Sequence, residues 1–359
     1  MKITRLRTRV AHLPVAKPFS TGRYDVKSID CVCVFLETDE GLVGEGMCYV
    51  TNGRRLKVLR EMVASLEHLV AGLQLGQSGS FVLNAFNDIR AFGRQGISAL
   101  AISAVEEALW DLRGKQFGVN VADILGACRT AVPSYANAMW LSATIDELHK
   151  EAEGGLLMQG FRAIKMHIGL PDPDKDVERV RAVREMVGPD VVLLVDAAQL
   201  IASPKASIRL ARRIEEFDIG WYEEPVMGGN PQSEAKVAAA IDIPVATGEY
   251  TYNHQGIFEL LQLKAADILM PDLQRMGGPT EFLKAAAVCE AFDIPVSSHV
   301  FPQMSLALMA SVPNASYHEY INWFDALYLE PVMRDESGAS IVSSRPGWGF
   351  AIDPSVLKD

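Results

Sequence analysis

The sequence lacks the long apolar stretches and the excess of basic residues that membrane and nucleic-acid proteins carry. A helix needs about 18 consecutive apolar residues to cross a bilayer, and no run in the 359 residues approaches that length. The first ten residues, MKITRLRTRV, contain no apolar core of a signal peptide. Lys and Arg number 34 against 45 Asp and Glu, so the net charge is -11 and no basic face is available to meet phosphates. We therefore expect a soluble, cytoplasmic protein with no nucleic-acid or membrane partner.

Cysteine is also scarce, and its spacing excludes a structural zinc site. The five cysteines are odd in number and follow no zinc-ligand pattern: Cys31, Cys33, Cys48, Cys128 and Cys289. Cys31 and Cys33 lie two residues apart in an apolar run, which places both on one face of a strand. We interpret them as core thiols of a protein in a reducing compartment.

Short apolar runs that end in an acidic or imidazole side chain recur through the second half of the sequence. The runs VVLLVDA, IGWYEEP, IPVATGE, ILMPDL, IPVSSH and ASYHEY close on Asp196, Glu223, Glu249, Asp272, His299 and Glu319. The spacings of 27, 26, 23, 27 and 20 residues each fit one strand and one helix. Strands of a parallel barrel end at one rim, where barrel enzymes keep their sites. The pattern predicts a parallel barrel with chemical groups around its mouth.

Strand and helix signals alternate from residue 131 to residue 324, which predicts an α/β fold of the (β/α)₈ TIM-barrel type. Strands are expected at 132–137, 161–168, 191–197, 219–225, 243–249, 268–273, 294–299 and 315–320. Ser203 before Pro204 is a helix N-cap followed by a proline in the first turn, and Pro279 opens a later helix. The helix expected at 303–312 is short.

Residues 1–130 follow a different pattern, typical of an α+β capping domain. The run SIDCVCVFLET at 28–38, the turn at 39–41 and the run LVGEGMCYV predict a β-hairpin. Helical periodicity follows at 54–73, 80–92 and 97–117. The polar, glycine-containing stretch 16–27 is expected to be a mobile loop over the site. Residues 325–359 are expected to return to this domain.

Three acidic residues on consecutive strands predict a metal site. Asp196, Glu223 and Glu249 supply three carboxylates without a His or Cys partner, which suits a hard cation, Mg²⁺ before Mn²⁺ or Ca²⁺. A single acid at a strand end is more often an N-cap or an ion-pair partner. Three in register favour the metal. Glu224 follows Glu223 directly and should point to the opposite side.

Two further pairs of residues are expected at the same mouth. Lys165 and His167 lie two apart near the end of a strand and therefore share a face. Lys165 is either an ion-pair partner of the acids or a cation that holds a substrate carboxylate, with His167 as an acid or base. Asp272 and His299 end neighbouring strands and are expected to form a carboxylate–imidazole pair, although a lone histidine is more often a satisfied core residue.

The ordered motifs AIKMH, LVDAAQ, WYEEP, TGEY, MPDLQRMGG, SSHVF and HEY resemble the enolase superfamily. The resemblance is to the mandelate racemase/muconate lactonizing enzyme family, in its mandelate racemase-like branch, and it covers most of the chain. It implies Mg²⁺ bound by Asp196, Glu223 and Glu249. It also implies a base that removes the proton α to a substrate carboxylate and gives an enediolate.

The same resemblance assigns roles to the remaining residues. His299 with Asp272 is one base, and Glu319 is the acid that hydrogen-bonds the developing enolate oxygen. Metal and Lys165 would neutralise the growing negative charge. Glu319 can donate only while protonated, so its pKa is expected to be raised, and His299 must be neutral to accept a proton.

The sequence departs from the racemase pattern at two positions. The pattern has Lys-x-Lys where this chain has Lys165 and His167, and it often has Asn where this chain has Ala198. The Lys-x-His arrangement suits dehydration of a sugar acid to a 2-keto-3-deoxy acid. The alternatives are a racemase or epimerase of a 2-hydroxy or 2-amino acid and, more remotely, a non-catalytic metabolite-binding barrel. The family forms dimers and octamers, so a homo-oligomer is expected. Substrate identity is expected to depend on residues 16–27, 48–54 and 137–140.

Overall fold

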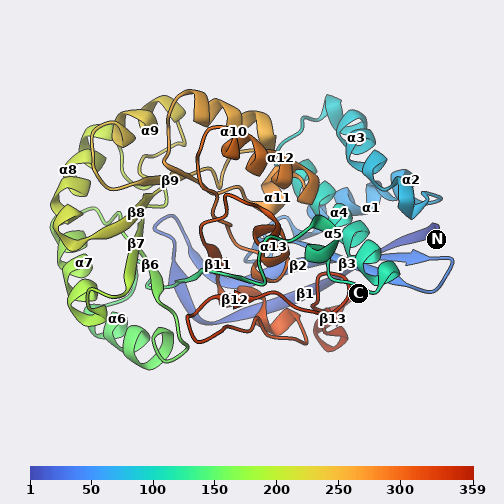
Figure 1. Cartoon of the computed structure of the whole chain (residues 1–359), viewed down its shortest axis with the longest axis horizontal. Helices are drawn as coiled ribbons and strands as arrows, with labels where there is room; N and C mark the ends of the chain where they lie inside the picture. Colours follow the sequence, from blue (N-terminus) through green and yellow to red (C-terminus); the bar gives the residue numbers. More distant parts are fainter.

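The computed structural model, which describes residues 1–153 and 155–359, contains a barrel and an α+β part that lies against it (Figure 1). The barrel strands form one seven-stranded parallel sheet in the order β10-β9-β8-β7-β6-β5-β11. Their bounds are β5 Ser134–Asn137, β6 Ala163–His167, β7 Val192–Asp196, β8 Ile219–Glu223, β9 Val245–Thr247, β10 Ile268–Leu269 and β11 His318–Tyr320.

Helices surround this sheet on the outside (Figure 1). They are α6 Ile145–Glu151, α7 Pro173–Val187, α8 Pro204–Ile214, α9 Pro231–Ala238, α10 Asn253–Gln262, α11 Leu273–Met276, α12 Pro279–Glu290 and α13 Pro302–Ser311. Several begin as their sequences predict. Ser203 accepts a hydrogen bond from the Ala206 N–H and so caps α8 before Pro204, and Pro279 opens α12.

The barrel closes through a segment that forms only isolated bridges. Val296 bridges to Leu269 on one side and to Ala315 on the other, and His299 bridges to Asp272. The strand predicted at 294–299 is therefore present as an extended connection rather than as a regular strand. Closure places the ends of all the strands at one rim, and the predicted barrel fold is confirmed.

The barrel interior below this rim is filled by side chains. Tyr135, Leu194, Trp221 and Met270 form one buried cluster, and the Tyr135 and Trp221 rings meet edge to face at 5.1 Å. Such a packed floor leaves the mouth as the place where polar groups collect. The ends of these strands lie at one level of the barrel, since Asp196 is in register with both His167 on β6 and Glu223 on β8.

The capping part is built on an antiparallel sheet in the order β13-β1-β2-β3. Its strands are β1 Ile3–Ser20, β2 Asp25–Thr38, β3 Val43–Thr51 and β13 Leu357–Lys358, and its helices are α1 Leu56–Ser65, α2 Glu67–Val70, α3 Gly79–Asp88, α4 Ile97–Phe117 and α5 Val121–Leu125. The hairpin of β2 and β3 is confirmed. The single helix predicted at 54–73 is wrong, because it breaks at Leu66 into α1 and α2.

The C-terminal segment packs on the capping sheet. Residues of β13 pair with Val10 and Ala11 of β1, and the indole N–H of Trp348 donates to the Glu107 carbonyl on α4. A short two-stranded sheet of β4 Ala131–Val132 and β12 Ser340–Ile341 joins this segment to the start of the barrel. The division into 1–130 with 325–359 and 131–324 stays a prediction. Among the described helices, none has the length and apolar character needed to cross a membrane.

The mobile loop predicted at 16–27 is wrong. β1 extends to Ser20 and β2 begins at Asp25, so only residues 21–24 form a turn. The buried Phe19 ring stacks on the Trp140 ring at 3.7 Å, and this contact holds the hairpin against the barrel mouth. At the turn, Arg23 donates from Nη2 to the Gln199 carbonyl at 3.1 Å. The stretch covers the mouth as expected, but as the ordered end of a hairpin.

Candidate functional site

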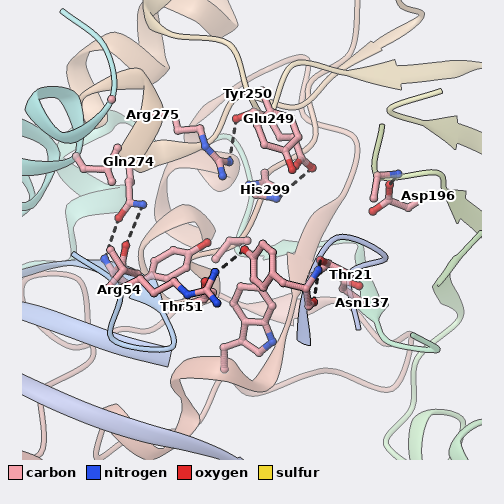
Figure 2. A pocket seen from close by; sticks show the side chains of 18 of the residues that line it. Thr21, Thr51, Arg54, Asn137, Asp196, Glu249, Tyr250, Gln274, Arg275 and His299 are labelled. Carbon is pink, nitrogen blue, oxygen red and sulfur yellow. Dashed lines mark hydrogen bonds and ion pairs between the residues drawn. The ribbon is translucent and has the colours of Figure 1, made fainter. Parts of the chain in front are cut away.

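A cavity of about 430 Å³ lies between the barrel mouth and the capping part (Figure 2). The barrel contributes residues from the ends of β5, β6 and β7 and from the segments that follow β9, β10 and His299. The capping part contributes the 21–24 turn, the end of β3 with residues 51–55, and the start of α4. A volume of this size accepts a small metabolite. The predicted rim chemistry therefore faces a cavity that the capping part partly covers.

Lys165 lies at the buried end of this cavity among three carboxylates. Its Nζ is 2.6 Å from Glu223 Oε1, 3.3 Å from Glu319 Oε1 and 3.7 Å from Asp196 Oδ2. Burial lowers the pKa of Lys165, but Glu223 and Glu319 outweigh burial and raise it well above the ordinary value. The lysine is therefore a fixed positive charge.

Two of the three predicted metal ligands, Asp196 and Glu223, lie beside this ammonium, and the third, Glu249, faces His299. Asp196 Oδ1 accepts from the Ala198 N–H at 2.6 Å, and Glu223 Oε2 accepts from the Trp221 indole at 3.0 Å. Glu249 follows β9 after Gly248, whose φ of 121° turns the chain at the rim. Its Oε2 lies 3.2 Å from His299 Nε2.

In this arrangement the three carboxylates do not converge on a common point. Across residues 1–153 and 155–359, no three His, Cys, Asp or Glu side chains come close enough to hold a metal ion in this arrangement. Lys165 and the Trp221 indole each donate to one oxygen of Glu223, and Glu249 is turned toward His299.

The chemistry of the donor set nevertheless fits a hard cation. All three donors are buried carboxylates, and burial together with the charge of Glu249 raises the pKa of Asp196 to about 6. Burial, with Asp196 and Glu249, likewise raises the pKa of Glu223. A divalent cation would relieve this crowding of negative charge.

Glu224 points away from the cavity, as the alternation along the strand predicts. It accepts from Gln199 Nε2 at 2.6 Å and from the Thr247 hydroxyl at 2.8 Å. Burial and the nearby Glu249 raise the pKa of Glu224 to about 8. It is a structural hydrogen-bonding group behind the rim.

His299 and Asp272 form the predicted carboxylate–imidazole pair. His299 donates from Nδ1 to Asp272 Oδ2 at 2.6 Å, which leaves Nε2 facing Glu249. Asp272 is held in turn, because its Oδ1 accepts from the Arg275 N–H at 2.7 Å. Burial lowers the pKa of His299, but Glu249 and Asp272 outweigh it and raise the pKa well above the ordinary value. This raised pKa depends on Glu249, a predicted metal ligand, so the neutral form expected for the working site stays a prediction.

His167 has the opposite electrostatic environment. Burial and the Lys165 charge hold the pKa of His167 well below its ordinary value, so the ring is neutral. The ring stacks on Trp140 at 4.2 Å, and Nε2 lies 2.9 Å from Asn137 Oδ1. The Asn137 amide donates from Nδ2 to Glu319 at 2.6 Å, so its oxygen must accept the proton of His167 Nε2. This hydrogen bond leaves Nδ1 unprotonated, 3.5 Å from Asp196 Oδ2.

The raised pKa expected for Glu319 is wrong. Burial raises the pKa of this group, but Lys165 and His299 outweigh burial and lower it below the ordinary value. Asn137 and the Val300 N–H both donate to its oxygens. Glu319 is therefore an ionised acceptor in this arrangement, since every neighbour that contacts it donates.

Asn137 and Trp140 complete the site, and only their segment was anticipated. Asn137 ends β5, as Asp196 and Glu223 end β7 and β8, and Trp140 follows shortly after it. The signal that found the acids therefore applies to Asn137 as well. An amide is a weaker chemical signal than a carboxylate, because amides are common at strand ends.

Two family models match the chain in succession. Residues 4–126 match the mandelate racemase/muconate lactonizing enzyme N-terminal domain, and residues 147–356 match the enolase C-terminal domain-like model. The chain belongs to the mandelate racemase/muconate lactonizing enzyme family. This family lies in the enolase superfamily, and the resemblance drawn from the sequence motifs is confirmed.

Relatives in this family catalyse different reactions. A 3,6-anhydro-alpha-L-galactonate cycloisomerase from Streptomyces coelicolor is 29% identical over 352 residues, covering 98% of this chain and 97% of the relative. An L-talarate/galactarate dehydratase from Salmonella typhimurium is 28% identical over 369 residues, covering 99% of this chain and 90% of the relative. The chain is thus similar to enzymes of two classes, lyases and isomerases.

Solved structures of the family superpose closely on the chain. A racemase from Streptomyces coelicolor A3(2) with bound magnesium has a TM-score of 0.93 at 30% identity, covering 98% of this chain and 97% of that chain. A mutant L-talarate/galactarate dehydratase with magnesium and L-glucarate has a TM-score of 0.94 at 27% identity, covering 99% of this chain and 91% of that chain. Magnesium is the metal that both structures hold.

Proposed function

We propose that the protein removes the proton α to the carboxylate of a sugar acid in a Mg²⁺-dependent reaction and eliminates water to give a 2-keto-3-deoxy acid. The observation that carries the proposal is that two imidazoles line one cavity, each with one ring nitrogen fixed by a hydrogen bond and the other directed toward a predicted metal ligand. His167 is bonded through Nε2 to Asn137 with Nδ1 toward Asp196, and His299 is bonded through Nδ1 to Asp272 with Nε2 toward Glu249. A dehydratase needs one group that accepts the α-proton and one that donates a proton to the departing hydroxyl.

Asp196, Glu223 and Glu249 are the residues that would hold Mg²⁺. The bound metal would neutralise the substrate carboxylate as negative charge develops on it. Lys165 supplies a second fixed charge at the same end of the cavity, since its ammonium already lies against Glu223 and Glu319. An ammonium that is fixed before the reaction stabilises the developing charge without reorganisation.

His299 would exchange its proton at Nε2, the nitrogen that faces the cavity. Its charge depends on Glu249, the strongest of the groups that raise its pKa. A metal ion on Glu249 would remove much of that influence and bring the pKa of His299 toward its ordinary range, where it can both accept and donate. Asp272 keeps the ring oriented in either state.

His167 would act at Nδ1, which carries a free lone pair directed toward Asp196. The pair Lys165 and His167 therefore combines a permanent cation with a neutral base, where two lysines would give two cations. Ala198 offers no side-chain amide to the substrate's 2-hydroxyl, so the hydroxyl contacts must come from other residues.

A racemase or epimerase is the second candidate, and one observation favours it. His167 lies on β6 and His299 on the closing segment, separated around the ring by β5 and β11. Two imidazoles on different sides of the mouth are placed to remove a proton from one face and return it to the other. The similarity to a solved racemase supports the same reading.

Product analysis distinguishes the two reactions. The Mg²⁺-loaded protein would be incubated with sugar acids and 2-hydroxy acids and the mixture followed by proton NMR. Methylene signals of a 2-keto-3-deoxy acid establish dehydration, whereas a second stereoisomer with an intact skeleton establishes racemisation. His299→Asn should abolish either reaction, and the exposed His68→Asn is the matched control that should retain it. Unchanged product formation by His299→Asn would contradict the proposal.

The remaining predictions from the sequence concern the location, the assembly and the partner. We retain as proposals a cytoplasmic location, a homo-oligomer of two or eight chains, and a small carboxylate as the partner. Sedimentation of the purified protein tests the oligomer.

A further inference from the structure

Arg179 is a buried arginine on α7 that does not line the cavity. Its two terminal nitrogens each donate to a backbone carbonyl at 3.0 Å, Nη1 to His167 and Nη2 to Trp140. Asp176 Oδ1 lies 3.9 Å from Nη1, which is beyond hydrogen-bonding distance, so the two carbonyls are the hydrogen-bond acceptors of this guanidinium group. Burying a cation is costly, and a buried cation that contacts two carbonyls therefore needs an explanation.

The two carbonyls belong to chain segments at the ends of neighbouring barrel strands. His167 ends β6, and Trp140 follows the end of β5. A guanidinium group is planar and holds its terminal N–H donors at a fixed separation, so it sets the distance between the two segments. The His167 N–H adds a further link, because it donates to the Met139 carbonyl at 3.1 Å. Both backbone groups of His167 are thus tied either to the segment after β5 or to the arginine that holds it.

The backbone between Asn137 and Trp140 is strained. Met139 is fully buried and has a φ of 56°, in the left-handed region that a residue with a side chain rarely adopts. Such a conformation persists only where surrounding contacts enforce it. The His167 N–H at the Met139 carbonyl and the Arg179 guanidinium at the Trp140 carbonyl supply these contacts. They fix the turn from which the Trp140 side chain extends.

The Trp140 ring is in turn a platform for the His167 imidazole. The two rings stack with their centroids 4.2 Å apart and their planes 18° from parallel. Phe19 also stacks on Trp140, at 3.7 Å, so the indole is held between two rings. Asn137 accepts from Nε2 of the imidazole at 2.9 Å, which leaves Nδ1 as the nitrogen without a hydrogen-bond partner. The imidazole is therefore fixed by one face and by one nitrogen.

We propose that Arg179 is a positioning residue of the reaction, which sets the His167 imidazole against Trp140 and Asn137 and so fixes the direction of Nδ1. This inference rests on the proposed function for the role of His167, and it adds a residue outside the cavity on which the reaction depends. Misplacing a reacting group by about 1 Å can lower a rate roughly 100-fold. A contact that fixes the backbone of the base should therefore affect the chemical step as well as stability.

The same helix carries a matched control. Arg184 also donates to backbone carbonyls at 2.7 or 2.8 Å, those of Phe217, Gly188, Val191 and Asp218. These carbonyls lie just before or near the starts of β7 and β8, at the opposite end of the barrel from the mouth. Arg184→Lys therefore removes the same kind of contact without touching the site.

Histidine ring spectra test the positioning without turnover. In ¹H–¹⁵N spectra of Mg²⁺-loaded protein labelled with ¹⁵N-histidine, the His167 signals are those that His167→Ala removes. Wild type should show one neutral tautomer with the proton on Nε2, and its ring protons should be shifted upfield by the stacked Trp140 indole. Arg179→Lys keeps the charge but presents a compact ammonium in place of the planar donors, so it should mix the two tautomers and reduce the upfield shift. Arg179→Gln, which can donate to only one of the carbonyls, gives a second variant with the same expectation, and Arg184→Lys should leave the signals unchanged.

Kinetics with galactarate and with galactonate complete the test. Arg179→Lys should lower kcat roughly 10–100-fold, as the loss of a supporting contact behind a reacting group does, and leave KM nearly unchanged. Arg184→Lys should retain kcat even if both variants lose the same Tm. Unchanged His167 signals in both Arg179 variants, or an equal loss of kcat in the two lysine variants, would overturn the positioning role even if the enzyme dehydrates sugar acids. Altered His167 signals in an Arg179 variant, with those of Arg184→Lys unchanged, would support it even if neither acid is turned over.

Discussion

Replacing Lys165 by methionine removes one ammonium from the most crowded group of charges in the protein. The side chain is 1% exposed, and Glu223, Glu319 and Asp196 all lie within 3.7 Å of Nζ. Methionine fills a similar volume, so the change creates no large cavity. What it leaves is a set of buried carboxylates with no cation among them.

The expected cost follows from that burial. Removing one partner of a buried ion pair destabilises a protein by about 3–5 kcal/mol. An unfolding entropy of about 2.1 cal/mol/K per residue converts this to a fall in Tm of roughly 4–7 °C for a chain of 359 residues.

The loss should depend on pH in a defined direction. Lys165 is the group that most lowers the pKa of Glu223 and Glu319, so in the variant the folded-state pKa of Glu223 rises further above the unfolded value and that of Glu319 loses the main influence that holds it below the unfolded value. A carboxyl with a raised folded pKa loses stability as pH rises above its unfolded pKa of about 4. The deficit should therefore be larger at pH 8 than at pH 5.

The assay is thermal unfolding of wild type and Lys165→Met at both pH values, with EDTA and with Mg²⁺. Mg²⁺ should stabilise the variant more than the wild type, because the cation replaces the lost ammonium. The exposed Lys205→Met is the control for a lost lysine charge. Equal stability of variant and wild type at pH 8 in EDTA would refute the electrostatic account of the site.

Three further substitutions have defined outcomes. Asp272→Asn should lower kcat by roughly 10³–10⁴ with folding intact, because an amide can hold the wrong tautomer of His299. Steady-state kinetics measures this loss, and full activity of the variant would exclude a catalytic role for the Asp272–His299 pair. Glu249→Gln should weaken Mg²⁺ binding at least tenfold in calorimetry, whereas Glu224→Gln, which changes a carboxylate facing away from the cavity, should bind normally. Burial raises the pKa of Glu107 to about 8, so the contribution of this group to stability should fall as pH rises from about 4.5 to 8. In thermal unfolding, Glu107→Gln should therefore melt higher than wild type at pH 9 and lose that advantage at pH 5.

The sequence located the barrel strands well because their chemistry is local. An apolar run shows the strand, and the acid after it shows the rim, so Asp196 and Glu223 mark the ends of β7 and β8 to the residue. His299 and Asp272 were paired correctly for the same reason, since neighbouring parallel strands end side by side.

Features that depend on contacts between distant segments were predicted less well. The composition of residues 16–27 is that of a loop, and only the packing of Phe19 on Trp140 from another part of the chain shows why it is a hairpin. The irregular register between Pro14 and Phe19 also hides the end of β1 from the alternation pattern. Strand periodicity cannot anticipate a contact made across the cavity.

Protonation was the least predictable property of the site. Glu319 was expected to be protonated from its assigned role, but Lys165 lies 3.3 Å away and Asn137 donates to it. The pKa of His299 is likewise governed by a neighbour, because Glu249 faces its free nitrogen. Both cases have one cause, because a pKa depends on the distances to neighbouring charges, and the sequence does not give those distances.

Solvent exchange at the α-carbon tests the central claim most directly. The protein would be incubated in D₂O with galactarate, glucarate, galactonate and gluconate, with Mg²⁺ or with EDTA. Deuterium at C2 would be measured by proton NMR and mass spectrometry. We predict deuterium incorporation or loss of the C2 proton with Mg²⁺, none with EDTA, and none in His299→Asn. Absence of exchange with every acid, in protein shown by calorimetry to bind Mg²⁺, would contradict the account.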